Sequence, residues 1–288
     1  MTSQAGSVES NLFKDAYFTH PDDVKWCLDQ LRRIYGLEGK TALEPAAGSC
    51  VFPEASPEVS WTTNELYPEF SNGVIHDHNL DFLKDDRSSL GQFDFVIGNP
   101  PYGRASAWAR KFVLLGLEHS NVVAMVLPKA LRRRTVWDKH FPDDCKVVFE
   151  EELPNSSFNL PDGQIKEVGT FFLVLERVPG YSRGMMLDYE PIGYKAAERR
   201  FDRKLEKQED WWYDWATHGV CCWGSSGLVF DRSRKKSLAF TVMMKLTDDQ
   251  AEKVRAIDWD ALVNRTKTSV PMISTAEVYT EVNRALAT

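Results

Sequence analysis

The segment FDFVIGNPPY, residues 93–102, decides the fold of this 288-residue chain and locates a candidate site in it. Its first half is apolar and β-prone, which predicts a buried strand over 93–98. The polar, proline-rich turn that follows, Asn99–Tyr102, therefore stands at the carboxyl end of a strand. Open α/β sheets bind their ligands at this end.

Short apolar runs alternate with helical patterns on both sides of this segment. The pattern predicts helices over 21–35, 104–119 and 129–139, and a long polar loop over 152–168. The expected strands cover residues 40–44, 60–66, 93–98, 121–127, 145–150 and 169–175. Such alternation is typical of an α/β fold with a mostly parallel sheet and helices on both faces.

The two ends of the chain differ from this middle part. Residues 1–14 are small and polar and are expected to form a flexible lead, followed by the α/β domain over 15–180. Residues 181–288 predict a small α+β appendage. Its expected elements are a charged helix over 195–216, strands near 219–230 and 238–246, and a helix whose capping box starts at Thr247.

Composition argues against several classes of protein. Hydrophobic residues make up 43% of the chain, enough for a sizeable core, and no apolar run approaches the roughly 18–20 residues that span a bilayer. The N-terminus lacks a secretory signal and the five cysteines lack zinc-ligand spacing, so we expect a cytoplasmic protein without a disulfide framework or a metal site. Residues 1–100 hold 7 Lys/Arg against 16 Asp/Glu, which leaves the rest of the chain compatible with a nucleic-acid surface.

The Asn99–Tyr102 turn is suited to hold a planar amino group. The side-chain oxygen of Asn99 and the backbone oxygen of Pro100 are two acceptors a few ångströms apart, and the proline ring restricts the backbone. Together they accept both N–H bonds of an exocyclic amine and aim its lone pair at an electrophilic methyl group. Tyr102 adds a flat face for stacking on a base. A plain turn with two prolines is the alternative interpretation.

Acidic residues follow the neighbouring expected strands. The small-residue loop Glu44–Ser49 lets backbone approach a ligand closely. Glu65 stands where nucleotide-binding sheets place the carboxylate that accepts from ribose hydroxyls, and Asp81 and Phe82 suit the amino group and the face of an adenine ring. Taken singly, an ordinary turn or a solvated acid explains each of them as well or better.

In this order, the elements resemble the S-adenosylmethionine-dependent amino-methyltransferases that modify adenine N6 in DNA. The order is similar to that of the gamma class of restriction–modification and phage enzymes. The resemblance covers residues 15–178 and implies a Rossmann-like class I methyltransferase sheet. The motifs that carry it are Phe18-Thr19-x-Pro21, Glu44-Pro45-x-x-Gly48, Glu65, Asp81-Phe82 and Asn99-Pro100-Pro101-Tyr102.

The resemblance also implies roles for individual residues. Asn99, Pro100, Pro101 and Tyr102 would be catalytic, and Tyr102 and Phe158 would stack on a target base flipped out of the helix. Glu65 would bind the ribose of the cofactor, Asp81 and Phe82 its adenine, and the Glu44–Gly48 loop with Thr19 its methionine part. The full set of implied cofactor residues is Phe18, Thr19, Pro21, Glu44, Pro45, Ala46, Gly48, Glu65, Asp81 and Phe82.

Two features depart from the family pattern. Cys50 stands where the family has a second glycine, and only about ten residues with two prolines separate it from the next strand, so the helix there is expected to be truncated. No Pro-Cys pair stands where a cytosine-C5 methyltransferase needs its nucleophile, which disfavours a covalent C5 mechanism.

Basic and aromatic clusters elsewhere have more than one interpretation. Phosphate contacts and solvated surface charges are both consistent with the candidate DNA-backbone residues Arg132, Arg133, Arg134, Arg232, Arg234, Lys235 and Lys236. The cluster Trp211, Trp212, Tyr213 and Trp215 is better explained as the core of the small domain or a dimer contact than as a base-stacking platform.

The sequence therefore predicts methyl transfer from S-adenosylmethionine to adenine N6 in DNA, single- or double-stranded. Residues 181–288 would contact DNA or form a homodimer, and their shortness predicts a weak or very short sequence preference. A methyltransferase acting on adenine in RNA or on a protein glutamine stays open. So does a non-catalytic nucleic-acid-binding subunit of the same fold.

Overall fold

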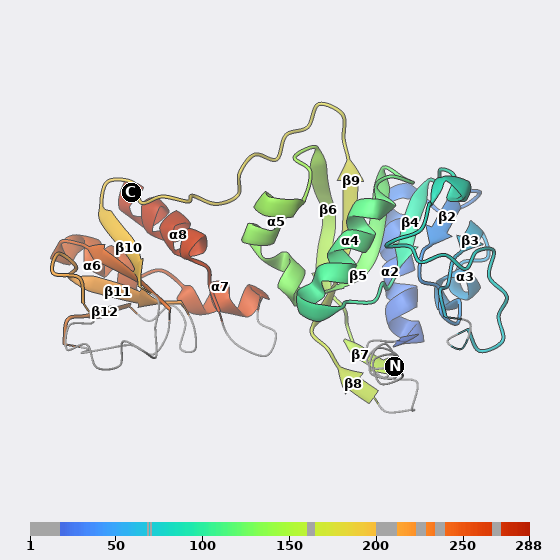
Figure 1. Cartoon of the computed structure of the whole chain (residues 1–288), viewed down its shortest axis with the longest axis horizontal. Coiled ribbons are helices and arrows are strands. Elements are labelled where there is room, and N and C mark those ends of the chain that lie inside the picture. The colour runs from blue at the N-terminus through green and yellow to red at the C-terminus, as the bar shows by residue number, and fades with distance from the viewer. Residues whose placement is uncertain are drawn as a thin grey trace, which may run out of the picture. The chain divides into compact units, whose positions relative to one another are not determined.

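The computed structural model of the chain forms two compact units (Figure 1). The first comprises Met1–Leu131 and Pro142–Arg183, and the second comprises Arg132–Phe141 and Gly184–Thr288. No helix among the described residues is long and apolar enough to cross a membrane. The structure describes residues 18–67, 69, 71–159, 165–199, 212–222, 229–233, 240–266 and 272–288, so the expected lead over 1–14 lies outside it.

The first unit is built on a six-stranded sheet in the order β3-β2-β4-β5-β9-β6. Strands β2 to β5 run parallel, and β9 runs antiparallel to both of its neighbours, β5 and β6. All six expected strands are confirmed, with ends that differ by at most three residues. Their bounds are β2 Thr41–Glu44, β3 Ser60–Thr63, β4 Phe95–Gly98, β5 Val122–Pro128, β6 Cys145–Glu152 and β9 Thr170–Arg177.

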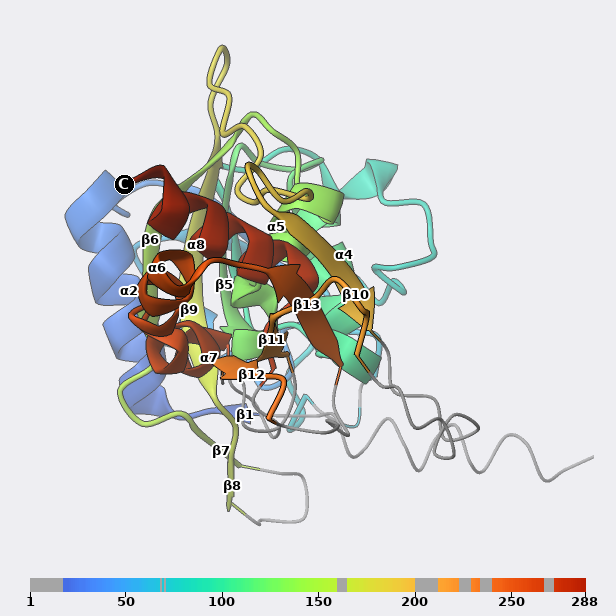
Figure 2. The ribbon, with the colours of Figure 1, turned by 90° about the vertical axis from the view of Figure 1, so that its left-hand side faces the viewer.

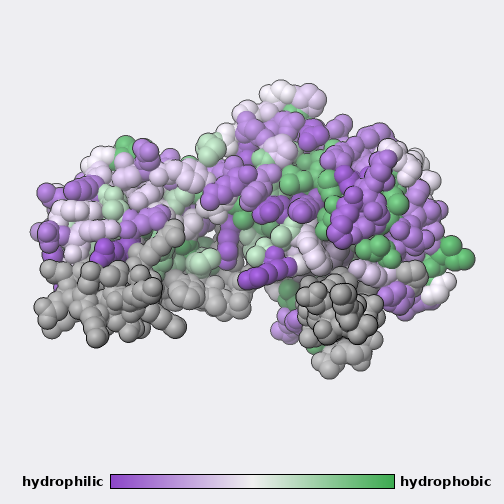
Figure 3. All heavy atoms as spheres, in the orientation of Figure 1, coloured by the Kyte–Doolittle hydropathy of each residue, from purple (hydrophilic) through white to green (hydrophobic). Residues whose placement is uncertain are grey.

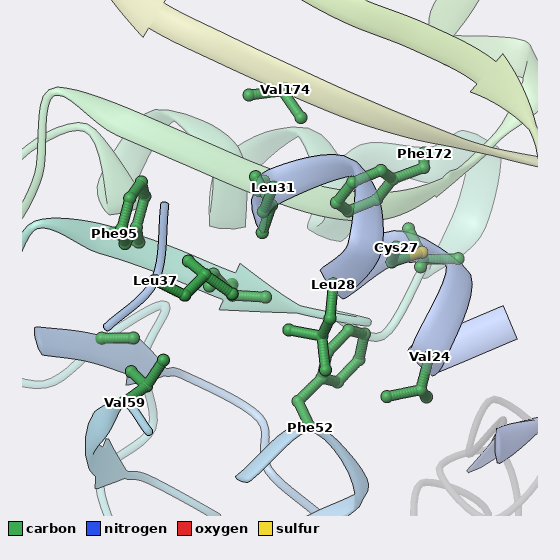
Figure 4. Close-up of a cluster of buried hydrophobic side chains, with 14 of the residues drawn as sticks. Val24, Cys27, Leu28, Leu31, Leu37, Phe52, Val59, Phe95, Phe172 and Val174 are labelled. Carbon is green, nitrogen blue, oxygen red and sulfur yellow. The ribbon is translucent and has the colours of Figure 1, made fainter. Parts of the chain in front are cut away.

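Helix α2 (Pro21–Tyr35) packs an apolar stripe against this sheet. The helix begins at Pro21, where the side chain of the N-cap residue His20 accepts a hydrogen bond from the backbone N–H of Asp22. Val24, Leu28 and Leu31 are fully buried, and their spacing places them on one helical face. Figure 4 shows Leu28 next to Phe52 of α3, within a cluster that also holds Phe95 of β4 and Phe172 of β9. Burial of each contributes roughly 1.5–3 kcal/mol.

The shorter helices follow the sheet with local irregularities. Helix α3 (Val51–Ala55) has only one turn, as the short spacing predicts. The helix expected over 104–119 starts with a 3-10 turn, Arg104–Ser106, because Ala105 and Ser106 adopt positive φ; α4 therefore covers only Ala107–Gly116. The helix expected over 129–139 is divided into a 3-10 turn, Lys129–Arg132, and α5 (Arg134–His140).

The expected loop over 152–168 contains a hairpin, which extends away from the main sheet (Figures 1 and 2). Strand β7 (Ser157–Asn159) pairs with β8 (Ile165–Glu167) and, on its other side, with β1 (Phe18–Thr19). In this register Thr19 stands opposite Phe158. The loop thus holds the first described residues of the chain in place.

The second unit combines an antiparallel sheet, in the order β10-β13-β11-β12, with helices. Its core joins apolar residues of β11 and β13, such as Val220 and Met244, to residues of all three C-terminal helices. The capping box expected at Thr247 is confirmed, with Gln250 as its partner. The elements are β10 Lys195–Arg199, β11 His218–Cys221, β12 Val229–Asp231, β13 Thr241–Lys245, α6 Asp248–Arg255, α7 Trp259–Thr266 and α8 Thr275–Ala287.

The prediction of a charged helix over 195–216 is wrong for both of its described parts. Residues 195–199 form strand β10 and residues 212–216 form no helix, while residues 200–211 lie outside the described part. Lys195 and Arg199 lie on one face of β10, about 13 Å apart, and two rings fill the space between them. Lys195 Nζ lies 4.5 Å from the centroid of a Trp215 ring, Trp215 stacks on Tyr213 at 5.3 Å, and Arg199 Cζ lies 5.1 Å from the Tyr213 ring. We call these four residues the aromatic–cation stack.

The stack and the pairing of β10 with β13 together outweigh the helical charge pattern. Nearby, Trp212 packs in a second small core with Met243 and Phe230, on the sheet face opposite the helices. Trp211 lies outside the described residues. Figure 3 shows hydrophilic residues over most of the face in view, with hydrophobic residues scattered among them.

Candidate functional site

A cavity of about 440 Å³ opens at the carboxyl ends of β2, β3 and β4 in the first unit. This volume lies in the range of small-molecule sites. The cavity brings together all the residues that the sequence marks as cofactor-binding except Pro21, which begins α2. The sequence-marked residues that line it are Phe18, Thr19, Glu44, Pro45, Ala46, Gly48, Glu65, Asp81, Phe82, Asn99, Pro100 and Pro101.

Glu65 connects two walls of the cavity. One carboxylate oxygen accepts the backbone N–H of Gly48 at 2.8 Å, and the other accepts that of Tyr67 at 2.9 Å. A carboxylate has about four lone-pair sites, so two remain for hydroxyl donors. Gly48 has φ +50°, and a Cβ there would lie 3.5 Å from the ring of Phe18, which packs directly over the loop.

Glu44 is the most unusual acid in the cavity. It is only 2% exposed, and among the described residues its Oε2 has no hydrogen-bond partner. Burial raises the pKa of its carboxyl well above the ordinary value, and the nearby Glu65 raises it further. A buried carboxyl without a partner is costly, and a cationic ligand group in the cavity would remove that cost.

Asn64 holds the cavity loops together, although sequence reasoning assigned it no role. Its side chain is 1% exposed and donates to the backbone oxygens of Pro45 at 3.0 Å and Leu80 at 3.1 Å. The side-chain oxygen accepts the backbone N–H of Leu80 at 2.8 Å. One amide thus ties the loop after β2, the end of β3 and the segment before Asp81.

Asp81 and Phe82, directly after the segment that Asn64 holds, also line the cavity. The Asp81 carboxylate accepts the backbone N–H of Leu83 at 3.1 Å and pairs with Lys84 at 2.7 Å. The Phe82 ring is 2% exposed and stacks on Phe112 of α4, with centroids 5.0 Å apart. Lys84 is 80% exposed, so its ion pair with Asp81 is weakly held and gives way readily to a ligand.

Cys50 adopts a left-handed backbone conformation that favours glycine, with φ at +61°. Its Sγ lies 3.8 Å from His76 Nδ1, and His76 Nε2 lies 2.7 Å from Ser71 Oγ. Burial raises the pKa of the thiol to about 12, and the charge of Glu44 adds to this. The thiol is thus neutral near pH 7 and connects the loop after β2 to the segment over 71–76.

Asn99 lines the cavity directly after β4. Its Nδ2 donates to Thr19 Oγ1 at 3.0 Å, and Thr19 is 4% exposed. This bond turns the amide so that its oxygen, the acceptor, lies on the branch away from Thr19. Because β1 is held by β7, the hairpin at Phe158 indirectly orients Asn99.

Tyr102 and Phe158 do not line the cavity. Tyr102 is 7% exposed, and Phe158 is 1% exposed within the core that packs on α2. In this structure, therefore, neither ring is exposed to the cavity where a target base would stack. Phe158 is buried because β7 places it in the core, opposite Thr19.

Two of the candidate DNA-backbone arginines, Arg134 and Arg232, have internal contacts. Arg134 of α5 pairs with Glu281 of α8 at 2.8 Å, with 19% and 10% of the two side chains exposed. Arg232 donates to the backbone oxygens of Asp214 and Ala216 and lies over the Trp212 ring. These contacts stabilise the second unit. Arg234, Lys235 and Lys236 lie outside the described residues.

Sequence reasoning missed several residues that line the cavity. Tyr67 follows Glu65, Lys84 follows Asp81, and Trp108 and Phe112 come from α4. Trp108 and Phe112 are four residues apart, the spacing of one helical face. Their position directly after the Asn99–Tyr102 turn was the available signal.

No family model matches the chain, and no curated protein is similar to it in sequence. Among solved structures, a Pyrococcus horikoshii protein assigned as an RNA methyltransferase is 17% identical, with a TM-score of 0.45 over 58% of this chain and 89% of that one. A methyltransferase subunit of a type I restriction–modification system from Streptococcus thermophilus is 19% identical, with a TM-score of 0.44 over 56% and 44% of the two chains.

At such identities and scores these likenesses carry no argument about activity. The fold is identified from the strand order itself, in which β9 lies between β5 and β6 and runs antiparallel to both. The first unit has a Rossmann-like α/β sheet of the class I methyltransferase type.

Proposed function

We propose that the protein transfers a methyl group from S-adenosylmethionine to the exocyclic N6 of adenine in DNA. The observation that carries this proposal is that Asn99 and the acids Glu44, Glu65 and Asp81 line one cavity. Their common lining supports an amine-holding turn that acts beside a site for a nucleoside with a cationic side chain.

The cofactor fits the chemistry of the cavity residues. Glu44, whose buried Oε2 has no partner among the described residues, is suited to an ammonium group. Glu65 keeps acceptor capacity for ribose hydroxyls, and the Phe82–Phe112 pair borders the end where an adenine ring would lie. Three acids against the single cation Lys84 favour a positively charged ligand.

The chain's own part in the reaction is positioning. Asn99 and the Pro100 carbonyl accept the two N–H bonds of N6, which makes its lone pair available along one direction. The cofactor would supply a methyl on a sulfonium: the methyl–sulfur bond breaks with its electron pair left on sulfur, the N6 lone pair forms the new bond, and N6 releases a proton to solvent. The target base must leave the stack to reach the cavity, which costs least in single-stranded or loosely paired DNA.

The test is an assay of the full chain with labelled S-adenosylmethionine and DNA from a methylation-free host, followed by nucleoside mass spectrometry. We expect N6-methyladenine as the product. Asn99→Ala should lower the rate about 100- to 1,000-fold, the usual loss for one preorganised polar group, and leave the cofactor Kd measured by calorimetry unchanged.

The matched control is Asn121→Ala, an exposed asparagine just before β5, which should retain full activity. Methyl transfer only to RNA or to a protein glutamine would overturn the DNA assignment while keeping the chemistry. Absence of cofactor binding would indicate a non-catalytic subunit instead.

A further inference from the structure

Trp108 occupies a place that neither the motif pattern nor the proposed reaction assigns. It stands in the first turn of α4, is partly exposed, and lines the cavity beside Asn99, Pro100 and Pro101. Phe112 follows one turn later on the same face, about 6 Å along the helix, and stacks on Phe82. Phe112 thus belongs to the Phe82 end of the cavity, and Trp108 to the Asn99 end.

Gly103 ties the Trp108 indole to the Asn99–Tyr102 turn. A Cβ at Gly103 would lie 2.6 Å from two ring carbons of Trp108, so the ring rests directly on the glycine backbone, and φ at Gly103 is +65°. The backbone N–H groups of Trp108 and Ala109 both donate to the backbone carbonyl oxygen of Tyr102, at 3.2 and 3.4 Å. The indole is therefore positioned by the same turn that presents Asn99.

Three other rings that line the cavity have neighbours outside the Asn99–Gly103 segment. Phe18 packs over Gly48, Tyr67 adjoins Glu65, and Phe82 pairs with Phe112. Tyr102 and Phe158 are 7% and 1% exposed and do not line the cavity. Trp108, by contrast, is packed against the backbone at Gly103, directly after the Asn99–Tyr102 turn.

A flipped base needs such a surface. Extrusion costs a few kcal/mol of lost stacking and pairing, and an aromatic side chain returns part of it, since base–aromatic stacking contributes about 1–3 kcal/mol. We propose that Trp108 is the side chain on which the target adenine stacks beside Asn99, in place of Tyr102 and Phe158. This inference rests on the proposed function and specifies its substrate contact.

The experiment uses the full chain and a DNA in which 2-aminopurine replaces the adenine that the wild-type protein methylates. Stacking on the indole quenches this fluorescent base. Trp108→Ala should raise the KM for unmodified DNA about 5- to 150-fold, the range that 1–3 kcal/mol of stacking gives. The bound 2-aminopurine should become brighter, and the cofactor Kd should change less than twofold.

Two further variants separate stacking from folding. Trp108→Phe keeps an aromatic face and should recover most of the KM and of the quenching. Trp61→Phe removes a tryptophan of β3, whose indole donates to the Ser56 oxygen, and should match the wild type. Unchanged KM and quenching in Trp108→Ala would overturn the proposal, and so would failure of Trp108→Phe to restore them.

Loss of cofactor affinity in Trp108→Phe, with quenching intact, would also overturn it by moving the indole to the cofactor site. These results differ from failure of the proposed function. In that case the wild-type protein itself transfers no methyl group to DNA.

Discussion

The cavity of the first unit and the aromatic–cation stack of the second both bring charged side chains against rings, but the charges are satisfied differently. In the stack, Lys195 and Arg199 each lie over a ring, and nearby Arg232 donates to two backbone oxygens. In the cavity, Glu44 is buried with an oxygen that has no partner among the described residues.

This difference teaches how to tell a site from a structural cluster. Both regions contain the residue types that bind nucleotides, so composition alone does not separate them. A cluster whose charges are paired internally is stable without a ligand, whereas a buried group without a partner costs free energy until something binds. On this criterion we propose the cavity as the binding site, and the stack as part of the fold of the second unit.

The largest expected effect comes from removing the amide that joins the cavity loops. Asn64→Ala deletes three hydrogen bonds, to Pro45 and twice to Leu80, at a cost of about 3 kcal/mol if each contributes about 1. We expect faster hydrogen exchange over residues 44–48 and 78–83, and a higher Kd for the cofactor by calorimetry.

Asn79→Ala is the matched control for Asn64→Ala. Asn79 is exposed, and its side chain makes a single hydrogen bond, to the backbone carbonyl oxygen of Glu65. It should change exchange in these segments only slightly. Equal effects of the two variants would show that Asn64 does not organise the cavity.

A smaller and pH-dependent effect is expected at Glu44. Burial, and secondly Glu65, raise its folded-state pKa above the unfolded value, which is about 4.3. Its contribution to stability is therefore fully present below that pH and lost as pH rises through the folded pKa. Glu44→Gln carries no such charge, so it should be more stable than the wild type at pH 7 to 8 and similar near pH 4, by urea unfolding.

Glu58→Gln provides a control of opposite sign. Burial acts to raise the pKa of Glu58, but its own backbone N–H and Arg32, 2.8 Å away, outweigh this and lower it. Its contribution is present above the unfolded pKa and lost as pH falls. Parallel pH profiles for the two variants would refute the assignment of a raised pKa to Glu44.

The same comparison explains how much the sequence predicts. Strand positions, the turn at Asn99 and the acids Glu44, Glu65 and Asp81 depend on patterns local to the chain, and parallel strands bring their carboxyl ends to one edge. These residues accordingly meet in one cavity. The shortness of α3 follows from the small number of residues between Cys50 and the next strand.

What the sequence does not predict depends on contacts between distant residues. Phe158 is buried because β7 pairs with β1, a pairing across about 140 residues that no local pattern indicates. Asn64 holds the cavity loops through three hydrogen bonds to residues distant in sequence. Trp108 is positioned by its contact with Gly103. Residues 195–199 have a helical charge pattern but form a strand, because rings from another segment fill the space between Lys195 and Arg199.

The smallest expected effect is the coupling within the stack. A Lys195→Met and Trp215→Leu double-mutant cycle, followed by urea unfolding of the full chain, should give a coupling of about 0.5–1 kcal/mol, as for exposed cation–π pairs. Lys245→Met is the control, since Lys245 pairs with Lys195 across β10 and β13. Two like charges opposite each other repel, so Lys245→Met should be neutral or slightly stabilising. A destabilisation equal to that of Lys195→Met would mean that bulk charge, rather than the ring beneath Lys195, holds β10 in the sheet.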